Sequence, residues 1–345
     1  MKNNINVIDF FCGCGGTSAG LEKSGMNVIA GVDIDTNALA TYGHNFPNAK
    51  AIKKSICDLE CVELEMAIGH KRNETLVFSA CAPCQPFSNQ NRNRRDDDVR
   101  RTLLDELHRF VIYFEPDFVI LENVPGMQKV QEGPFTRFLN FLDDMGYSYD
   151  TDVKNTMDYG VPQSRKRLVL IASKHGSIEL PKETHGKEKI PYKTVKDTIA
   201  SYPKLYAGQE HKTIANHRAR NVSDLNLKRL KATPEGGDRR HWSEDLILEC
   251  HKKTTGFSNV YGRMFWDKPS PTLTTNCTAL SSGRYGHPEQ NRAISVREAG
   301  ALQTFDDDFV FIGSIQNTSR QVGNAVPVLF AKALGDSVIK SIKEL

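Results

Sequence analysis

Short apolar runs alternate with stretches of helical periodicity along the first half of the chain. The runs are rich in Val, Ile, Leu and Phe, and they occupy residues 5–11, 27–34, 76–80, 118–123 and 167–173. Helical spacing of apolar residues fills the intervals at 17–25, 37–46, 101–114 and 134–146. Because strands that alternate with helices build parallel sheets, the pattern predicts a Rossmann-like α/β fold, with a mostly parallel sheet and helices on both faces.

The pattern weakens from about residue 181 to residue 290, where Lys, Pro, Gly and His replace the periodic apolar positions. Such a stretch is typical of an irregular second domain or a large insertion. Helical spacing returns at 326–345, so the end of the chain is expected to pack on the first domain. We therefore predict one domain from residues 1–182 and 316–345, and a smaller irregular one from residues 183–315.

Charge changes this picture in one segment. The 345 residues carry a formal net charge of only +3, yet residues 182–240 hold 14 Lys or Arg against 7 Asp or Glu. A local excess of positive charge indicates a surface that faces a polyanion, although an ordinary solvated surface is the alternative. No run of about 18 apolar residues is present, and the N-terminus lacks a signal-peptide layout, so we expect a cytoplasmic protein without a membrane anchor.

A glycine turn follows the first predicted strand. Gly13, Gly15 and Gly16 stand where open α/β sheets bind ligands, and Asp33 ends the second strand, where a carboxylate often accepts bonds from a ribose. Asp58 is expected near the end of the following strand. Together these residues favour an adenosine-containing ligand; a structural turn and a nicotinamide-dependent oxidoreductase are the alternatives.

The fourth apolar run is followed by a thiol between two prolines. Pro83 and Pro86 restrict the backbone around Cys84, which suits a nucleophile held in one direction. Cys81 and Cys84 also form a C-x-x-C pair, which leaves a redox or zinc site as an alternative. Glu122 follows the next apolar run, where a partly buried carboxyl could donate a proton, or simply cap a backbone group.

Six blocks in order make the chain similar to the bacterial DNA cytosine-5 methyltransferases: DFFCGCGG, PCQPFS, ENV, QSRKR, REAGALQTF and QVGNAVP. The resemblance implies the fold of methyltransferases that use S-adenosylmethionine, with a target-recognition domain in the irregular segment. It implies no metal, and S-adenosylhomocysteine as the product. The cofactor residues would be Phe11, Gly13, Gly15, Gly16, Asp33, Ile34, Asp58, Leu59, Pro83 and Asn324.

The same resemblance implies covalent catalysis on a cytosine that is rotated out of double-stranded DNA. Cys84 would add to C6 while Glu122 acts at N3, and Arg165 and Arg167, expected on one face of a strand, would hold the base and its phosphate. Residues 88–101 are expected to act as a basic lid. The DNA contacts would include Gln85, Ser88, Arg95, Gln163, Arg240 and Arg263.

The resemblance further suggests a monomer that protects DNA against a separate restriction endonuclease. One branch of the family methylates tRNA, which remains the alternative substrate. Two departures stand out: most relatives have Glu at the position of Asp33, and Cys12 and Cys14 are unusual in the glycine turn. Oxidation of Cys14 near the cofactor is a hypothesis that follows from the second departure.

Overall fold

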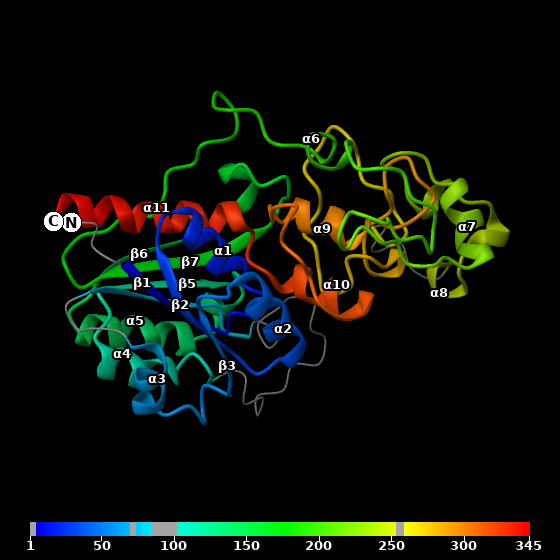
Figure 1. Ribbon diagram of the computed structural model, residues 1–345. Helices are drawn as coiled ribbons and strands as arrows, with labels where there is room; N and C mark the ends of the chain where they lie inside the picture. Colours follow the sequence, from blue (N-terminus) through cyan, green and yellow to red (C-terminus); the bar gives the residue numbers. More distant parts are fainter. Residues whose placement is uncertain (1–4, 70–73, 84–101, 253–258) are drawn as a thin grey trace. The chain divides into compact units, whose positions relative to one another are not determined.

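A computed structural model describes residues 5–69, 74–83, 102–252 and 259–345 of the chain (Figure 1). The fold divides into two compact units. The first consists of Met1–Tyr159, Lys166–Glu183 and Val326–Leu345, and the second of Gly160–Arg165 and Thr184–Ala325. The second unit therefore takes two pieces that the sequence assigned to the first, residues 160–165 and 316–325. Gln163 bridges to Ser270, and helix α10 (Ile315–Asn324) packs against α9 (Val296–Leu302), so both pieces are tied to the second unit.

A seven-stranded sheet forms the centre of the first unit, in the order β3-β2-β1-β4-β5-β7-β6. The first five strands run parallel, whereas β7 is antiparallel to both β5 and β6. This arrangement confirms the mostly parallel α/β sheet. The strands are β1 (Ile5–Phe10), β2 (Asn27–Asp33), β3 (Lys50–Lys53), β4 (Thr75–Ala80), β5 (Phe118–Asn123), β6 (Ser148–Asn155) and β7 (Lys166–Ser173).

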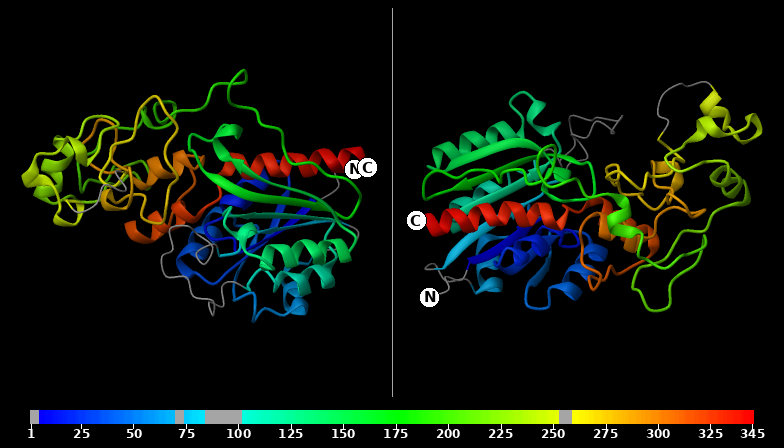
Figure 2. Two further views of the ribbon diagram at one scale, coloured as in Figure 1. Left: turned by 180° about the vertical axis from the view of Figure 1, so that it is seen from behind. Right: turned by 90° about the horizontal axis from the view of Figure 1, so that it is seen from above.

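Helices cover both faces of this sheet. Figure 1 and the left view of Figure 2 show α1 and α11 on one face, with α4 and α5 on the other. The helices of the first unit are α1 (Gly16–Lys23), α2 (Thr36–Asn45), α3 (Cys61–Ile68), α4 (Leu107–Phe114), α5 (Pro134–Asp144) and α11 (Val328–Glu344). Helices α1 and α11 can approach closely because Gly20 has no side chain: a Cβ there would lie 2.5 Å from Ala331.

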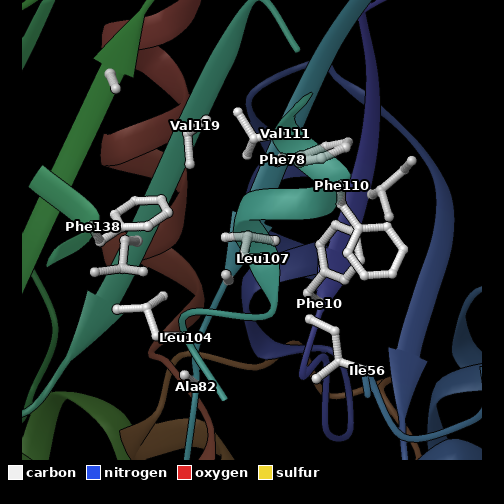
Figure 3. Close-up of a cluster of buried hydrophobic side chains, with 14 of the residues drawn as sticks. Phe10, Ile56, Phe78, Ala82, Leu104, Leu107, Phe110, Val111, Val119 and Phe138 are labelled. Carbon is white, nitrogen blue, oxygen red and sulfur yellow. The ribbon is translucent and has the colours of Figure 1, made fainter. Parts of the chain in front are cut away.

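The main core lies between the sheet and α4 and α5. Figure 3 shows Phe10 of β1 and Phe78 of β4 directed towards Phe110 of α4. The ring of Phe10 is centred 5.1 Å from each of the other two rings, and all three side chains are fully buried. Full burial of one such aromatic side chain contributes roughly 1.5–3 kcal/mol, so this cluster fixes β1 relative to its neighbours. The carboxyl end of β1 is thereby held where the glycine turn begins.

The second unit contains short helices joined by irregular backbone, and its described residues form isolated β-bridges rather than named strands. Buried arginines stabilise this unit from inside through ion pairs and hydrogen bonds to backbone carbonyls. Arg292 pairs with Glu298 at 2.6 Å, and both side chains are buried. Arg297 donates to three backbone carbonyls. The helices are α6 (Val195–Ile199), α7 (Asp224–Lys231), α8 (Glu249–Lys252), α9 (Val296–Leu302) and α10 (Ile315–Asn324).

One described segment, Ile315–Glu344, is long and apolar enough to span a membrane by length and composition, but 61% of its window is buried inside the protein. Pro327 and its neighbours divide this segment into α10 and α11, in two different units. The segment therefore has the character of two core helices.

Candidate active site

The glycine turn begins directly after β1 and leads into α1. Phe11 has a φ of 58°, which is unusual for a residue with a side chain, and Gly13 and Gly15 have φ values of 54° and 97°. Gly15 is the N-cap of α1, and Gly16 is the first helical residue. The turn therefore depends on glycine at two positions where the backbone is left-handed.

Asp33 ties the end of β2 to this turn. Its Oδ2 accepts a hydrogen bond of 2.8 Å from the backbone N–H of Gly13, and its Oδ1 accepts one of 2.8 Å from the N–H of Asp35. Burial raises the pKa of Asp33, and these backbone donors partly offset that effect. A carboxylate oxygen can accept more than one bond, so Asp33 can hold the turn and still receive a ribose hydroxyl.

The neighbouring residues fit a nucleoside at this edge. The side chain of Ile34 is 68% exposed, and Asp58 is also exposed, so both are accessible to a ligand. Asp58 lies in a turn beyond β3 rather than at the strand end that the sequence suggested. Leu59 is fully buried in the core, so its side chain supports the turn from behind. Pro83, just beyond the end of β4, is half-buried.

Replacing Gly15 with Ala should weaken cofactor binding at least tenfold. The new Cβ would lie 2.2 Å from the ring of Phe46 and would strain a residue with a φ of 97°. Either the ring of Phe46, the residue that follows α2, or the turn must therefore move. Isothermal titration of the purified variant with S-adenosylmethionine measures the effect.

Gly25→Ala is the matched control, because Gly25 has a φ of 96° but no atom within 4 Å of an added Cβ. It introduces the same backbone strain, which costs about 1–2 kcal/mol, away from the turn. Equal affinity in both variants would show that the contact with Phe46 does not position the turn.

Glu122 lies at the carboxyl end of β5, and only 5% of its surface is exposed. Its Oε1 pairs with Nε of Arg167 at 2.7 Å, and its Oε2 accepts a hydrogen bond of 2.9 Å from Sγ of Cys81. The antiparallel pairing of β5 and β7 brings Arg167 to this position. Asn123 also donates to the carbonyl of Ala82, which ties the ends of β4 and β5 together. The carboxylate is thus held by a cation, a thiol and a fixed backbone.

The sequence did not identify Cys81 as a partner of Glu122, because a cysteine after a strand usually signals packing. The Cys81 thiol, the first of the C-x-x-C pair, donates its hydrogen bond to Glu122, so in this structure it is engaged with a carboxylate. Cys84, Gln85, Ser88 and Arg95 lie outside the described residues, as does the whole of the basic lid expected at 88–101. Their roles remain predictions.

Arg165 and Arg167 do not lie on one strand, contrary to the expectation. Strand β7 begins at Lys166, and Arg165 belongs to the second unit, where it is buried and donates to the carbonyls of Leu273 and Gly323. Arg167 is the arginine that contacts the carboxylate of Glu122. The two arginines therefore have different partners: Arg165 donates to backbone carbonyls, whereas Arg167 pairs with an acidic side chain.

The family model of C-5 cytosine-specific DNA methylases matches residues 5–340. The chain belongs to this family. It is 42% identical over 344 residues to the type II methylase M.HgiDII of Herpetosiphon aurantiacus. That alignment covers 98% of this chain and 94% of the relative. It is 35% identical to the type II methyltransferase M1.HphI of Haemophilus parahaemolyticus, covering 98% and 87%.

A solved Escherichia coli protein, described as a DNA modification methyltransferase encoded within a prophage, has the same fold. The TM-score is 0.77 at 23% identity, and the match covers 99% of this chain and 100% of the other. At this identity the likeness concerns the fold alone. The predicted methyltransferase fold is thereby confirmed.

Two of the DNA contacts expected for this methylase are internal residues instead. Gln163 is fully buried, with its amide bonded to Gln303 and to the backbone N–H of Leu273. Arg263 is 4% exposed, and its guanidinium donates to the carbonyls of Thr233, Leu230, His287 and Gln290 and to the side chain of Asn291. Neither side chain has a free face for DNA in this structure, which corrects the expectation.

Arg240 and Asn324 are placed differently. The side chain of Arg240 is 72% exposed and pairs with Asp238 at 2.7 Å, and this arginine holds the pKa of Asp238 well below its usual range. Asn324, the last residue of α10, is exposed. Both side chains are accessible, so the DNA contact of Arg240 and the cofactor contact of Asn324 stay predictions.

Replacing Arg263 with Ala should destabilise the protein by roughly 3 kcal/mol or more, because several buried carbonyls would lose their donor. Chemical denaturation followed by circular dichroism measures the loss. Arg320→Ala removes the same side chain from an exposed position of α10, in the same unit, and should leave the midpoint near that of the parent. If both variants unfold at the parent's midpoint, Arg263 does not support the second unit.

The thiol of Cys14 does not fit the oxidation hypothesis. It is 2% exposed, and burial raises its pKa to about 12, so the reactive thiolate is scarce at neutral pH. The pKa of the buried Cys12 thiol is likewise raised well above its ordinary value. Both cysteines behave as small apolar residues that fill space beneath the turn.

Proposed function

We propose that this chain transfers a methyl group from S-adenosylmethionine to C5 of cytosine in a specific short sequence of duplex DNA, as the modifying half of a restriction-modification system. The cluster of Glu122, Arg167 and Cys81 carries the proposal. It places a buried carboxylate at the carboxyl end of the parallel sheet, the same edge that bears the glycine turn. Membership of the cytosine-specific family and similarity to type II methylases support the same reaction.

The chemistry must overcome the weak nucleophilicity of cytosine C5. Cys84 is proposed to add its thiolate to C6 while Glu122 protonates or hydrogen-bonds N3, which turns the ring into an enamine. S-adenosylmethionine, when bound, supplies the methyl group as an electrophile. A base then removes the C5 proton, the C6–S bond breaks, and the thiolate of Cys84 is regenerated.

Arg167 has two consequences for Glu122. Its guanidinium fixes the orientation of the carboxylate by a contact of 2.7 Å, and its charge stabilises the carboxylate after the proton has moved. The hydrogen bond from Cys81 fixes the second oxygen. Oε1 has the ionic contact with Arg167 but no hydrogen-bond partner among the described residues, so it can still bond to the base while Oε2 is held, which is the preorganisation that general-acid catalysis requires.

The second unit is proposed to recognise the DNA sequence. Its basic segment agrees with this role, although several of its arginines, including Arg229 and Arg239, are buried. The surface charge is therefore smaller than the sequence count implies. The target cytosine must leave the helix to reach the active site, at a cost of a few kcal/mol that contacts with phosphates would offset.

We further propose that the enzyme acts as a monomer in the cytoplasm, beside a separate restriction endonuclease. The relatives reported above are type II methylases, which makes tRNA the less supported substrate. Transfer of radioactive methyl groups from S-adenosylmethionine to duplex DNA and to tRNA, measured side by side, tests the choice. Incorporation into DNA alone is the expected result, and incorporation into tRNA alone would overturn it.

A further inference from the structure

A fully buried carboxyl that the proposed chemistry does not use lies beneath the glycine turn. Asp9 is the penultimate residue of β1 and has no exposed surface. Its Oδ2 accepts a hydrogen bond of 2.7 Å from Oγ of Ser18 on α1, and that Oγ lies 3.1 Å from the hydroxyl of Tyr42 on α2. Within the described part of the chain its Oδ1 has no hydrogen bond of good geometry, although the hydroxyl of Ser79 on β4 is close enough to lower the pKa of Asp9.

Among the residues that the structure describes, no positive charge balances an ionised Asp9. No ion pair of this part of the chain includes Asp9, and the described groups that face it are neutral or acidic. They come from the described elements packed around it: Cys12 and Cys14 in the turn, Ser18 on α1, Asp33 on β2, Tyr42 on α2 and Ser79, its register partner on β4. An unpaired buried charge is costly, so a cation that approached Asp9 would stabilise its ionised form.

The protonated and the ionised forms of Asp9 are both populated near neutral pH. Burial raises its pKa to about 7, and the hydrogen bond from Ser18 is the largest contribution in the opposite direction. The hydrogen-bonded hydroxyls of Ser18 and Tyr42 can bond to Asp9 in its protonated and in its ionised form. Tyr42 can donate to Ser18 and Ser18 to the carboxylate, and the direction reverses when the carboxyl is protonated, because hydroxyls both donate and accept. A nearby cation can therefore remove the proton without breaking the chain.

The cation that comes to this edge of the sheet is the cofactor. We propose that Asp9 provides the counter-charge for the sulfonium of S-adenosylmethionine: its carboxyl releases a proton when the cofactor binds, and keeps it when S-adenosylhomocysteine, whose sulfur is neutral, takes its place. The turn that follows Asp9 is the one Asp33 fastens through Gly13. Asp9 is thus a positioning residue that favours substrate over product, and the inference rests on the cofactor assignment made above.

Linkage gives the sign of the effect. Protonated Asp9 must lose its proton before the cofactor binds tightly, so the affinity for S-adenosylmethionine rises as the pH rises through about 7. The dissociation constant should be about tenfold larger at pH 6 than at pH 8. The affinity for S-adenosylhomocysteine should lack this component, so the ratio of the two affinities should change by the same factor.

The test is isothermal titration of the full chain at pH 7, in two buffers with different ionisation enthalpies, which counts the protons released on binding. Asp9→Asn is the main variant, and Glu22→Gln is the control, since it neutralises an exposed carboxylate of α1 that takes no part in the proposed cofactor site. Parent and Glu22→Gln should release about half a proton more with S-adenosylmethionine than with S-adenosylhomocysteine. Asp9→Asn should abolish that difference. The amino group of the ligand titrates alike in all three proteins and cancels.

Ser18→Ala keeps the carboxyl and removes its donor, and serves if Asp9→Asn does not fold. Loss of the donor disfavours the ionised form, so the proton release should move to higher pH. Equal release with both ligands, or an unchanged difference in Asp9→Asn, would overturn the inference while leaving the proposed function intact. A parent protein that binds neither ligand would overturn the cofactor assignment and this inference with it.

Discussion

Cys84→Ala is expected to abolish methyl transfer while S-adenosylmethionine still binds with nearly the parent's affinity. Without a nucleophile at C6, C5 of the cytosine is not activated, and no other group in the proposed mechanism replaces the thiolate. Transfer of radioactive methyl groups to DNA measures the loss, and isothermal titration measures cofactor binding.

Cys57→Ala is the matched control, because Cys57 is an exposed cysteine of the first unit and should be dispensable. A second readout is independent of turnover. DNA containing 5-fluorocytosine blocks the removal of the C5 substituent, so the parent should form a covalent complex that survives denaturation, and Cys84→Ala should not. Substantial turnover in Cys84→Ala would contradict the assignment of the nucleophile.

Glu122→Gln should slow the chemical step by roughly 10²-fold or more, in line with the contribution of a general acid. The amide keeps the size of the carboxyl, but it loses the ionic contact with Arg167 and cannot deliver a proton to N3 in the same way. Single-turnover rates at saturating cofactor and DNA report the step directly.

Glu115→Gln makes the same chemical change at an exposed glutamate, whose side chain is 62% exposed and pairs with Lys174, and it should leave the rate unchanged. The thermal midpoint of Glu122→Gln should fall, because the largely buried Arg167 loses its ionic partner, while its cofactor affinity at a temperature where it is folded should stay close to the parent's, which separates catalysis from folding. An unchanged single-turnover rate would remove Glu122 from the catalytic set.

The sequence predicted the buried strands better than the edge strands. Runs such as residues 118–123 are apolar at almost every position because both faces of a central parallel strand are covered. The edge strands were predicted less well. A strand was expected before Asp58 but not located, since Lys50–Lys53 of β3 is largely exposed, and β6 was missed, since Ser148–Asn155 alternates polar residues with few apolar ones. The helix expected at 101–114 begins at Leu107, because Leu103 to Glu106 form turns.

In the candidate site, too, some residues could be predicted from the sequence and others could not. Gly15 and Glu122 were predictable because a strand end fixes where a residue stands. Burial of polar side chains was not: Arg263 was assigned to DNA, yet it bonds to five groups inside the second unit. An arginine that binds phosphate and one that binds carbonyls share the same side chain, and only the fold distinguishes them. The burial of Asp9 could not be predicted for the same reason, because in the sequence it is one polar residue within an apolar strand.

Cytosine methylation by this protein can be detected by bisulfite sequencing. The chain is expressed in a host that lacks cytosine methylation, with the Cys84→Ala form as the control, and the genomic DNA of both is converted and sequenced. Protected cytosines are expected at one short recurring sequence with the parent protein and at no site with the variant. Full conversion in both, from cells that contain soluble protein able to bind S-adenosylmethionine, would contradict the claim that this enzyme methylates cytosine in DNA.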